Sequence, residues 1–212
     1  IEDDYDSEFR YKGKPVPALQ GTDQNGRVIY IGTFSKSIAP AIRISYLVLP
    51  EPLLEKCEKA LGCFSSTVSR IDQMVLNHFI QEGYFERHLN RMRRIYGRKH
   101  DILLGELKKL SGVCRITGEN AGVHLLVEFV DGMSEEEIIR RASAQKVRVY
   151  PLSEYTIDAS RVPAEGQEKD GHKESWKQRT RSAVLLGYAT LSEQELLEAA
   201  RRLLSAWGGA DR

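Results

Sequence analysis

Lys36 is the residue in this sequence whose type and position best suit covalent chemistry. It follows the apolar run 28–34, and Thr33 and Ser35 place hydroxyl groups beside it. Lysine is seldom buried, and an amine withdrawn from water loses its proton more easily, which suits Schiff-base formation with a carbonyl compound. The hydroxyls could bind a phosphate, and Arg43 could bind the same phosphate through two parallel hydrogen bonds. Taken alone, Ser35-Lys36 is more typical of a solvated loop.

A second polar group, made of Asp3, Asp4 and Tyr5, ends a segment that reads as a strand, upstream of Lys36. A carboxylate opposite a pyridine nitrogen keeps that nitrogen protonated, and a tyrosine hydroxyl can bond the phenolic oxygen of the same ring. These are the groups that make pyridoxal phosphate (PLP) an electron acceptor. The acidic segment alone is more typical of a loop. Together, the two strand ends predict a PLP site with Lys36 as the Schiff-base lysine.

The apolar patterns around these residues predict the elements that must hold them. Strands are expected over 28–34 and 44–49, and helices over 53–61, 66–82 and 84–110. Gly83 is expected to end the middle helix. The long last helix carries a basic stripe, which is typical of a solvated helix face: Arg91, Arg93, Arg94, Arg98 and Lys99.

The pattern changes after Gly112. Strands are expected over 113–116, 123–130, 147–150 and 183–188. Ser134-x-x-Glu137 and Ser192-x-x-Glu195 read as capping boxes that open two further helices, the first ending near residue 145. Residues 160–182 are polar and contain glycine and proline, so a mobile loop is expected there.

These patterns predict an α/β protein of two domains. Residues 1–95 read as the second half of an α/β layer, and residues 96–212 as a small α+β domain whose sheet is covered on one side. The first five residues, beginning with Ile1, read as the end of a buried strand without a starting methionine. The chain is therefore expected to be part of a longer protein.

The composition of the 212-residue chain limits the classes of function. There are 31 basic and 30 acidic residues, a net charge of +1, and this balance offers no electrostatic footprint for nucleic acid. The three cysteines, Cys57, Cys63 and Cys114, lack a zinc-binding spacing and are expected to be buried free thiols in a reducing cytoplasm. No apolar run reaches the ~18 residues of a membrane span.

The two strand ends resemble the MocR-type regulators, bacterial transcription factors of the GntR superfamily. These join an N-terminal winged helix-turn-helix to a fold-type I aminotransferase-like domain. The likeness covers nearly the whole chain and rests on these segments: Glu2 to Tyr11, Tyr30 to Ser37 with Pro40 and Arg43, Gly83 to His88, Arg91 to Arg98, Ala121 to His124, and Leu185 to Ala189. The first two blocks are specific in combination, whereas the helix and the Gly187-Tyr188-Ala189 strand are weak alone.

The resemblance implies that residues 1–95 are the C-terminal part of a PLP-binding large domain, and it implies a role for each matching residue. Asp3 would pair with the pyridine nitrogen, Tyr5 would bond the phenolic oxygen, and Lys36 would form the Schiff base. The phosphate would be held by Thr33, Ser35 and Arg43. In related aminotransferases an arginine of the small domain binds the substrate carboxylate, and the choice here is Arg181, with Arg148 and Arg161 as rivals. The polar loop over 160–182 departs from the compact family pattern, which weakens this last assignment.

The resemblance leaves three functions open. The first is an effector-sensing domain of a PLP-dependent regulator that binds an amino acid or amine, dimerises, and reaches DNA only through a winged-helix domain that this chain lacks. The second is a working PLP-dependent aminotransferase. The third is a scaffold that binds no cofactor. The first half of the large domain is also missing, with its glycine-rich phosphate loop and the aromatic that stacks on the ring, so the cofactor site in this chain is expected to be incomplete.

Overall fold

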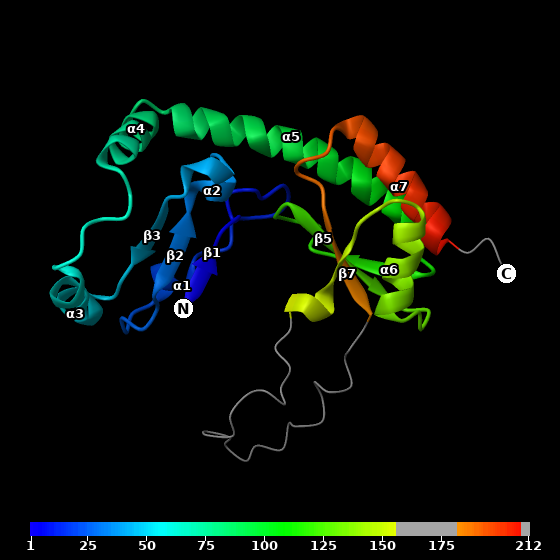
Figure 1. Ribbon diagram of the computed structural model, residues 1–212, viewed down its shortest axis with the longest axis horizontal. Helices are drawn as coiled ribbons and strands as arrows, with labels where there is room; N and C mark the ends of the chain where they lie inside the picture. The colour runs from blue at the N-terminus through cyan, green and yellow to red at the C-terminus, as the bar shows by residue number, and fades with distance from the viewer. Residues whose placement is uncertain (156–181, 209–212) are drawn as a thin grey trace, which may run out of the picture. The chain divides into compact units, whose positions relative to one another are not determined.

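The computed structural model describes residues 1–155 and 182–208 (Figure 1). The chain divides into two compact units. Unit 1 comprises Ile1–Gly97 with Asn120–Gly122, and unit 2 comprises Arg98–Glu119 with Val123–Arg212. The predicted polar loop over 160–182 lies outside the described residues, except for Ser182. No helix in the described ranges is long and apolar enough to cross a membrane.

The sheet of unit 1 has three strands in the order β1-β2-β3, formed by Glu2–Asp4, Tyr30–Thr33 and Ser45–Val48. β1 runs parallel to β2, and β3 runs antiparallel to it. The strand predicted over 28–34 is therefore shorter than expected. Residues Phe34–Ser37 form the one-turn helix α2 instead, because the Thr33 hydroxyl accepts the backbone N–H of Ser35 as a helix N-cap.

Three longer helices follow the sheet of unit 1: α3 (Glu51–Leu61), α4 (Arg70–Gln81) and α5 (Tyr84–Leu107). α4 starts later than predicted, since Ser69 is its N-cap and accepts from the backbone N–H of Asp72. Gly83 separates α4 from α5 with a φ of 71°, a left-handed conformation that glycine adopts without steric cost. Two shorter helical turns complete the unit: α1 (Leu19–Thr22) and η1 (Pro40–Ile42).

The first half of α5 packs on the segments that carry the candidate residues. Phe85 meets Phe34 of α2 edge-to-face at 5.9 Å between ring centroids, and Tyr96 meets Phe9 in the same way at 5.0 Å. Arg93 donates from Nε to the carbonyl of Glu8 at 2.7 Å. The basic stripe is thus not simply a solvated face, because Arg93 is used to hold the chain just after β1.

The sheet of unit 2 is antiparallel, with the order β4-β5-β7-β6. Its strands are Cys114–Thr117, His124–Phe129, Ala183–Gly187 and Tyr150–Pro151, respectively. Along β5 fully buried residues alternate with half-buried ones, and the register places Leu125 opposite Leu186 and Val127 opposite Val184. One face of the sheet is therefore the core face, in line with the expected one-sided covering.

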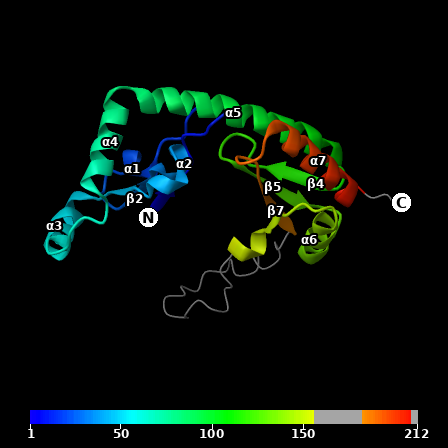
Figure 2. The ribbon, with the colours of Figure 1, turned by 45° about the horizontal axis from the view of Figure 1, so that its top comes forward.

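Helices α6 (Glu135–Ala144) and α7 (Glu193–Trp207) contact each other, and α7 lies beside the second half of α5 (Figure 2). Short turns complete the unit: η2 (Lys108–Leu110) and η3 (Leu152–Tyr155). Trp207 closes the core: its side chain is 1% exposed, its ring meets Phe129 edge-to-face at 5.0 Å, and its Nε1 donates to the carbonyl of Ile138 at 3.2 Å.

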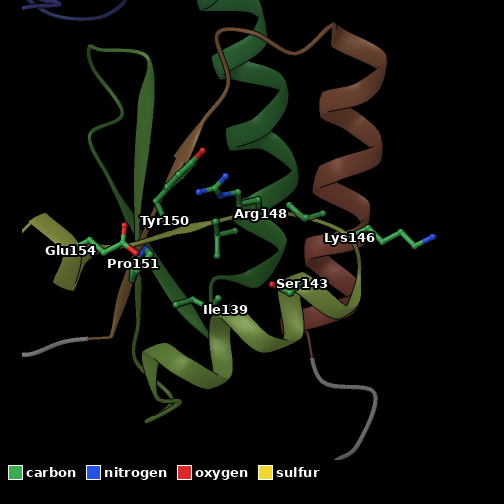
Figure 3. A pocket seen from close by; sticks show the side chains of 9 residues that line it. Ile139, Ser143, Lys146, Arg148, Tyr150, Pro151 and Glu154 are labelled. Atoms are coloured by element: carbon green, nitrogen blue, oxygen red, sulfur yellow. The ribbon is translucent and has the colours of Figure 1, made fainter.

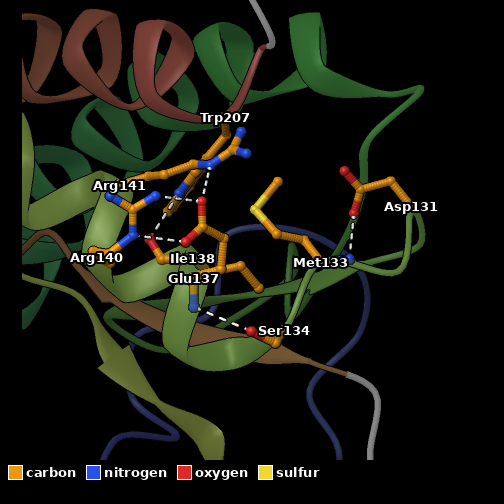
Figure 4. A network of polar contacts seen from close by, with 8 residues as sticks. All are labelled: Asp131, Met133, Ser134, Glu137, Ile138, Arg140, Arg141 and Trp207. Carbon is orange, nitrogen blue, oxygen red and sulfur yellow. Dashed lines mark hydrogen bonds and ion pairs between the residues drawn. The ribbon is translucent and has the colours of Figure 1, made fainter.

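Two sequence predictions need correction in unit 2. The strand predicted over 147–150 shrinks to Tyr150–Pro151, which pairs with β7. Ser134 does cap α6 by accepting from the backbone N–H of Glu137, but the return bond of a capping box is missing (Figure 4). The Glu137 carboxylate instead binds both Arg140 and Arg141, which lowers the pKa of Glu137 to about 2. The second predicted capping box, at Ser192, is complete.

The three cysteines are free, as predicted, but they are not all buried. Only Cys114 lies in the core, Cys57 is half-buried and Cys63 is exposed. The expectation of three buried thiols was therefore wrong, because α3 has no buried residue and leaves the thiol that follows it in solvent.

Candidate functional site

The candidate residues gather at one edge of the sheet of unit 1 because of the strand directions. β1 and β2 are parallel and in register, with Asp3 opposite Ile31, so their carboxyl ends meet at the same edge. β3 is antiparallel, so it starts at this edge, where Ser45 lies opposite Thr33. The turn after β1, the helix α2 after β2 and the turn before β3 are therefore neighbours.

Lys36 lies on α2, one turn beyond the end of β2, and its side chain is exposed. The expectation of a lysine buried at a strand end was wrong for this chain, because the backbone turns into a helix after Thr33 and carries Lys36 out of the sheet layer. Within residues 1–155 and 182–208, its amine has no hydrogen-bond or salt-bridge partner. A solvated amine without a partner can reach an incoming carbonyl group.

Arg43 stands beside α2 in a strained conformation. Its φ of 50° and ψ of 34° lie in the left-handed region, which costs a residue with a side chain about 1–2 kcal/mol. The strain is held by the next residue, since the Ile44 carbonyl accepts from the Phe34 backbone N–H at 3.0 Å and from the Thr33 hydroxyl at 3.3 Å. The Arg43 guanidinium is exposed and has no partner among the described side chains, so it is available to an anion.

The hydroxyl groups around Lys36 differ in availability. The Thr33 hydroxyl already accepts from Ser35 and donates to Ile44, so a phosphate role would require its hydrogen to turn away from the Ile44 carbonyl. Ser35 is half-buried, and its side chain makes no hydrogen bond within the part of the chain that the structure describes. The Ser37 hydroxyl is 1% exposed and likewise lacks a described partner. Ser35 is thus the better hydroxyl donor for a bound anion.

Asp3 and Tyr5 bracket the end of β1, and both side chains are exposed. Asp3 shares a face of the sheet with Ile31 and Thr33, because side chains alternate along a strand. Sequence reasoning assigned no role of its own to Asp4, the residue between them. Asp4 points to the other face and binds Tyr30 and Ser7. Strand alternation relative to Asp3 is the signal that could have separated the two aspartates.

The edge as a whole offers a carboxylate on one strand and two cations on its neighbours. A ligand with a protonated ring nitrogen and a phosphate complements this arrangement, since the carboxylate favours the former and Arg43 the latter. An amine such as that of Lys36 can attack a carbonyl carbon held between them. Among the described residues no group of histidine, cysteine and carboxylate side chains could hold a metal ion.

The arginine expected to bind a substrate carboxylate has three candidates. Arg181 and Arg161 lie outside the described residues. Arg148 is described: it lines an open hollow of about 540 Å³ formed by α6, β6 and η3 in unit 2 (Figure 3). Its guanidinium lies over the Tyr150 ring, 5.0 Å from the centroid, and the Glu154 carboxylate also lines the hollow. The carboxylate-binding role of each arginine stays a prediction.

Known proteins resemble this chain in sequence over almost all of its length. The uncharacterized HTH-type transcriptional regulator YhdI of Bacillus subtilis (strain 168) is 39% identical over 208 residues, 98% of this chain and 40% of the regulator. The probable rhizopine catabolism regulatory protein MocR of Rhizobium meliloti is 34% identical over 98% of this chain and 38% of its own length. The chain thus spans about two fifths of these curated relatives. No family model matches the chain.

A solved structure has the same fold. LysN, the alpha-aminoadipate aminotransferase of Thermus thermophilus complexed with N-(5'-phosphopyridoxyl)-L-leucine, superposes with a TM-score of 0.74. The identity is 28%, and the match covers 98% of this chain and 49% of LysN. The predicted fold, the second half of a fold-type I large domain followed by a small α+β domain, is confirmed.

Proposed function

Because this chain belongs to the MocR-type regulators, as the C-terminal part of their aminotransferase-like domain, we propose that it senses an effector through PLP. The observation that carries the proposal is the meeting of Asp3, Lys36 and Arg43 at one edge of one sheet, which the strand directions require. A carboxylate, an amine and a guanidinium at such an edge complement the ring nitrogen, aldehyde and phosphate of PLP.

In this proposal each residue acts on one part of the cofactor. Asp3 would keep the pyridine nitrogen protonated, Tyr5 would donate to the phenolic oxygen, and Lys36 would supply through Nζ the amine that binds the aldehyde carbon. The phosphate is held by Arg43, Ser35 and Thr33. When bound, PLP would supply an aldehyde carbon that reacts with primary amines. The rest of the cofactor cradle would come from the remainder of the longer protein.

The ligand would be an amino acid or an amine, since only a primary amine can replace Lys36 on the cofactor. Its binding energy could then favour one arrangement of a regulator over another. We further propose that the longer protein is a cytoplasmic homodimer that contacts DNA through an N-terminal winged-helix domain. The likeness to HTH-type regulators supports this, whereas the balanced charge of this chain offers no nucleic-acid footprint.

A working aminotransferase is the second candidate, and the likeness to LysN favours it. Lys36 would then also carry a proton between the substrate Cα and the cofactor carbon. The two candidates use the same residues, so only turnover separates them. An amino donor converted to its keto acid by the full-length protein at a steady rate would favour the enzyme.

The decisive experiment compares the visible absorbance of full-length wild type and Lys36→Ala after incubation with PLP. Wild type is expected to show the band of a Schiff base that borohydride removes, and Lys36→Ala is expected to lack it. Lys99→Ala is a matched control, because Lys99 is used structurally, donating to the Ala189 carbonyl at 2.7 Å. Equal bands in wild type and Lys36→Ala would exclude the proposed site, and no band in either would favour a scaffold that binds no cofactor.

A further inference from the structure

The Asp4 carboxylate accepts three hydrogen bonds at the candidate edge. Its Oδ2 accepts from the Tyr30 hydroxyl and from the Ser7 hydroxyl, each at 2.7 Å. Its Oδ1 accepts from the Ser7 backbone N–H at 3.1 Å. One carboxylate thus joins the start of β2 to the turn that follows β1, and that turn begins with Tyr5.

Strand alternation separates Asp4 from its neighbour Asp3. The parallel register places Asp3 opposite Ile31 and Asp4 opposite Gly32, so the two carboxylates leave β1 on opposite faces. Asp3 is exposed and has no described partner, whereas Asp4 is half-buried and bonded three times. The pair therefore divides into one carboxylate that is free for a ligand and one that is committed to the protein.

Aromatic contacts connect Tyr30, a hydrogen-bond partner of Asp4, to the third strand and to α2. The Tyr30 ring lies 6.1 Å from the ring of Tyr46 on β3, and Tyr46 also contacts Phe34 of α2 at 5.4 Å. Burial, followed by hydrogen bonding to Asp4, raises the pKa of Tyr30 above its usual range. The Tyr30 hydroxyl therefore stays protonated and acts as the hydrogen-bond donor to the Asp4 carboxylate.

We propose that Asp4 is a positioning residue that sets the orientation of Asp3 and Tyr5 toward the cofactor ring. This inference rests on the proposed PLP site. Two of the three bonds of Asp4 run to Ser7 in the turn after β1, and these fix the backbone of that turn. The bond to Tyr30 joins β1 to β2 and would by itself serve the stability of the sheet, whereas the bonds to Ser7 act on the turn. Asp3 and Tyr5, the residues on either side of Asp4, are thereby held in fixed positions, as a precise contact with the cofactor ring requires.

Loss of the Asp4 carboxylate should shift the titration of the Schiff-base absorbance to higher pH. If Asp3 turns from the ring, the pyridine nitrogen loses its proton more easily, and its positive charge no longer repels a proton on the Schiff-base nitrogen. The absorbance band of the Schiff base should then titrate at higher pH, by about 0.5–1 unit, in Asp4→Ala. The affinity for PLP should fall about tenfold, as expected for the loss of one or two well-placed hydrogen bonds.

The experiment uses the full-length protein with PLP and follows absorbance against pH, PLP affinity and thermal stability together. Asp4→Asn keeps an oxygen acceptor for Ser7 and should restore most of the wild-type titration. Ser7→Ala removes one bond on an exposed side chain, so it tests the same idea if Asp4→Ala fails to fold. Asp23→Asn is the matched control: Asp23 accepts three backbone N–H groups in the β1–β2 connection, so its loss should lower stability and leave the titration unchanged.

The outcomes are distinct. An upward shift in Asp4→Ala and Ser7→Ala, with rescue in Asp4→Asn, supports the positioning role. A stability loss in Asp4→Ala with an unchanged titration and affinity, or an unchanged titration in a folded Ser7→Ala, overturns it while leaving the PLP site intact. Absence of the band in wild type overturns the proposed function itself.

Discussion

A methyl group added at Gly32 should strike the Tyr46 ring, and this makes the packing of β2 against β3 testable. Gly32 is buried and lies opposite Tyr46 in the antiparallel pair. A Cβ built on Gly32 would lie 2.7 Å from Cε1 of Tyr46 and closer still to Cζ. Real Cβ atoms do not approach so closely, so Gly32→Ala must push the Tyr46 ring away or displace the strand.

The loss of folding stability in Gly32→Ala follows from the contacts that the displaced Tyr46 ring gives up. Its ring contacts Tyr30 at 6.1 Å and Phe34 at 5.4 Å between centroids, and each aromatic pair contributes about 0.5–1.5 kcal/mol. Gly32→Ala should therefore lower the free energy of unfolding by about 1–3 kcal/mol, the usual range for overpacking. In a Tyr46→Ala background the same change should be neutral or slightly stabilising, because alanine costs less backbone entropy than glycine in a strand.

The assay is urea unfolding of wild type, both single variants and the double variant, followed by far-UV circular dichroism. Gly105→Ala is the control, since Gly105 is exposed in the last turn of α5 with nothing near its Cβ position, and it should stabilise by up to about 1 kcal/mol. Costs of Gly32→Ala that agree within about 0.5 kcal/mol in the two backgrounds would refute the reasoning, because they would show that the two sites are independent.

Two further predictions concern unit 2. Burial raises the pKa of the Cys114 thiol to about 11, so the folded state keeps a proton that the unfolded chain releases from about pH 9. The contribution of the protonated thiol to the free energy of unfolding should be complete below pH 9 and should fall by about 2–3 kcal/mol as the pH rises to about 11. The difference in unfolding free energy between wild type and Cys114→Ala should therefore narrow over that range, and a constant difference would contradict the prediction. Ser192→Ala should cost about 1 kcal/mol in urea unfolding and Ser192→Asp much less, because Ser192 accepts from the Glu195 backbone N–H; equal costs would show that the cap is not responsible.

The helix starts show where local sequence is enough and where it fails. Ser192 and Glu195 form both bonds of the predicted capping box. Ser134 and Glu137 have the same spacing but form only one of them, since Arg140 and Arg141 lie three and four residues after Glu137 and take its carboxylate. The two arginines that compete with the cap for the Glu137 carboxylate could be identified from the sequence, because residues three and four positions apart are neighbours on a helix surface. The outcome depended on the relative strength of an ion pair and a cap.

The strands were predicted less well than the helices. The run over 28–34 is mostly apolar, but the strand ends at Thr33 because the Ile44 carbonyl accepts from Thr33 and Phe34 and the helical turn starts there. That contact joins residues ten or more apart, so no local pattern reveals it. The run over 147–150 gives a strand only at its end, where Tyr150 pairs with Leu185. Pairing partners distant in sequence decide where a strand starts and stops.

The sequence by itself determined which residues could do chemistry at this edge, and it determined the fold. Residue types and apolar periodicity are local properties, and they predicted an α/β chain of two domains. The resemblance of the segments around Asp3 and Lys36 to the MocR-type regulators then implied the fold-type I domain. Only the tertiary structure decided that Lys36 is solvated on α2, that Arg43 is held in a left-handed conformation, and that Asp4 is bonded to the protein while Asp3 is free. The first two features depend on the contact of the Ile44 carbonyl with Thr33 and Phe34. The third depends on the register of β1 and β2, whose paired residues lie 28 positions apart, and that register is set by packing between strand faces and not by neighbours along the chain.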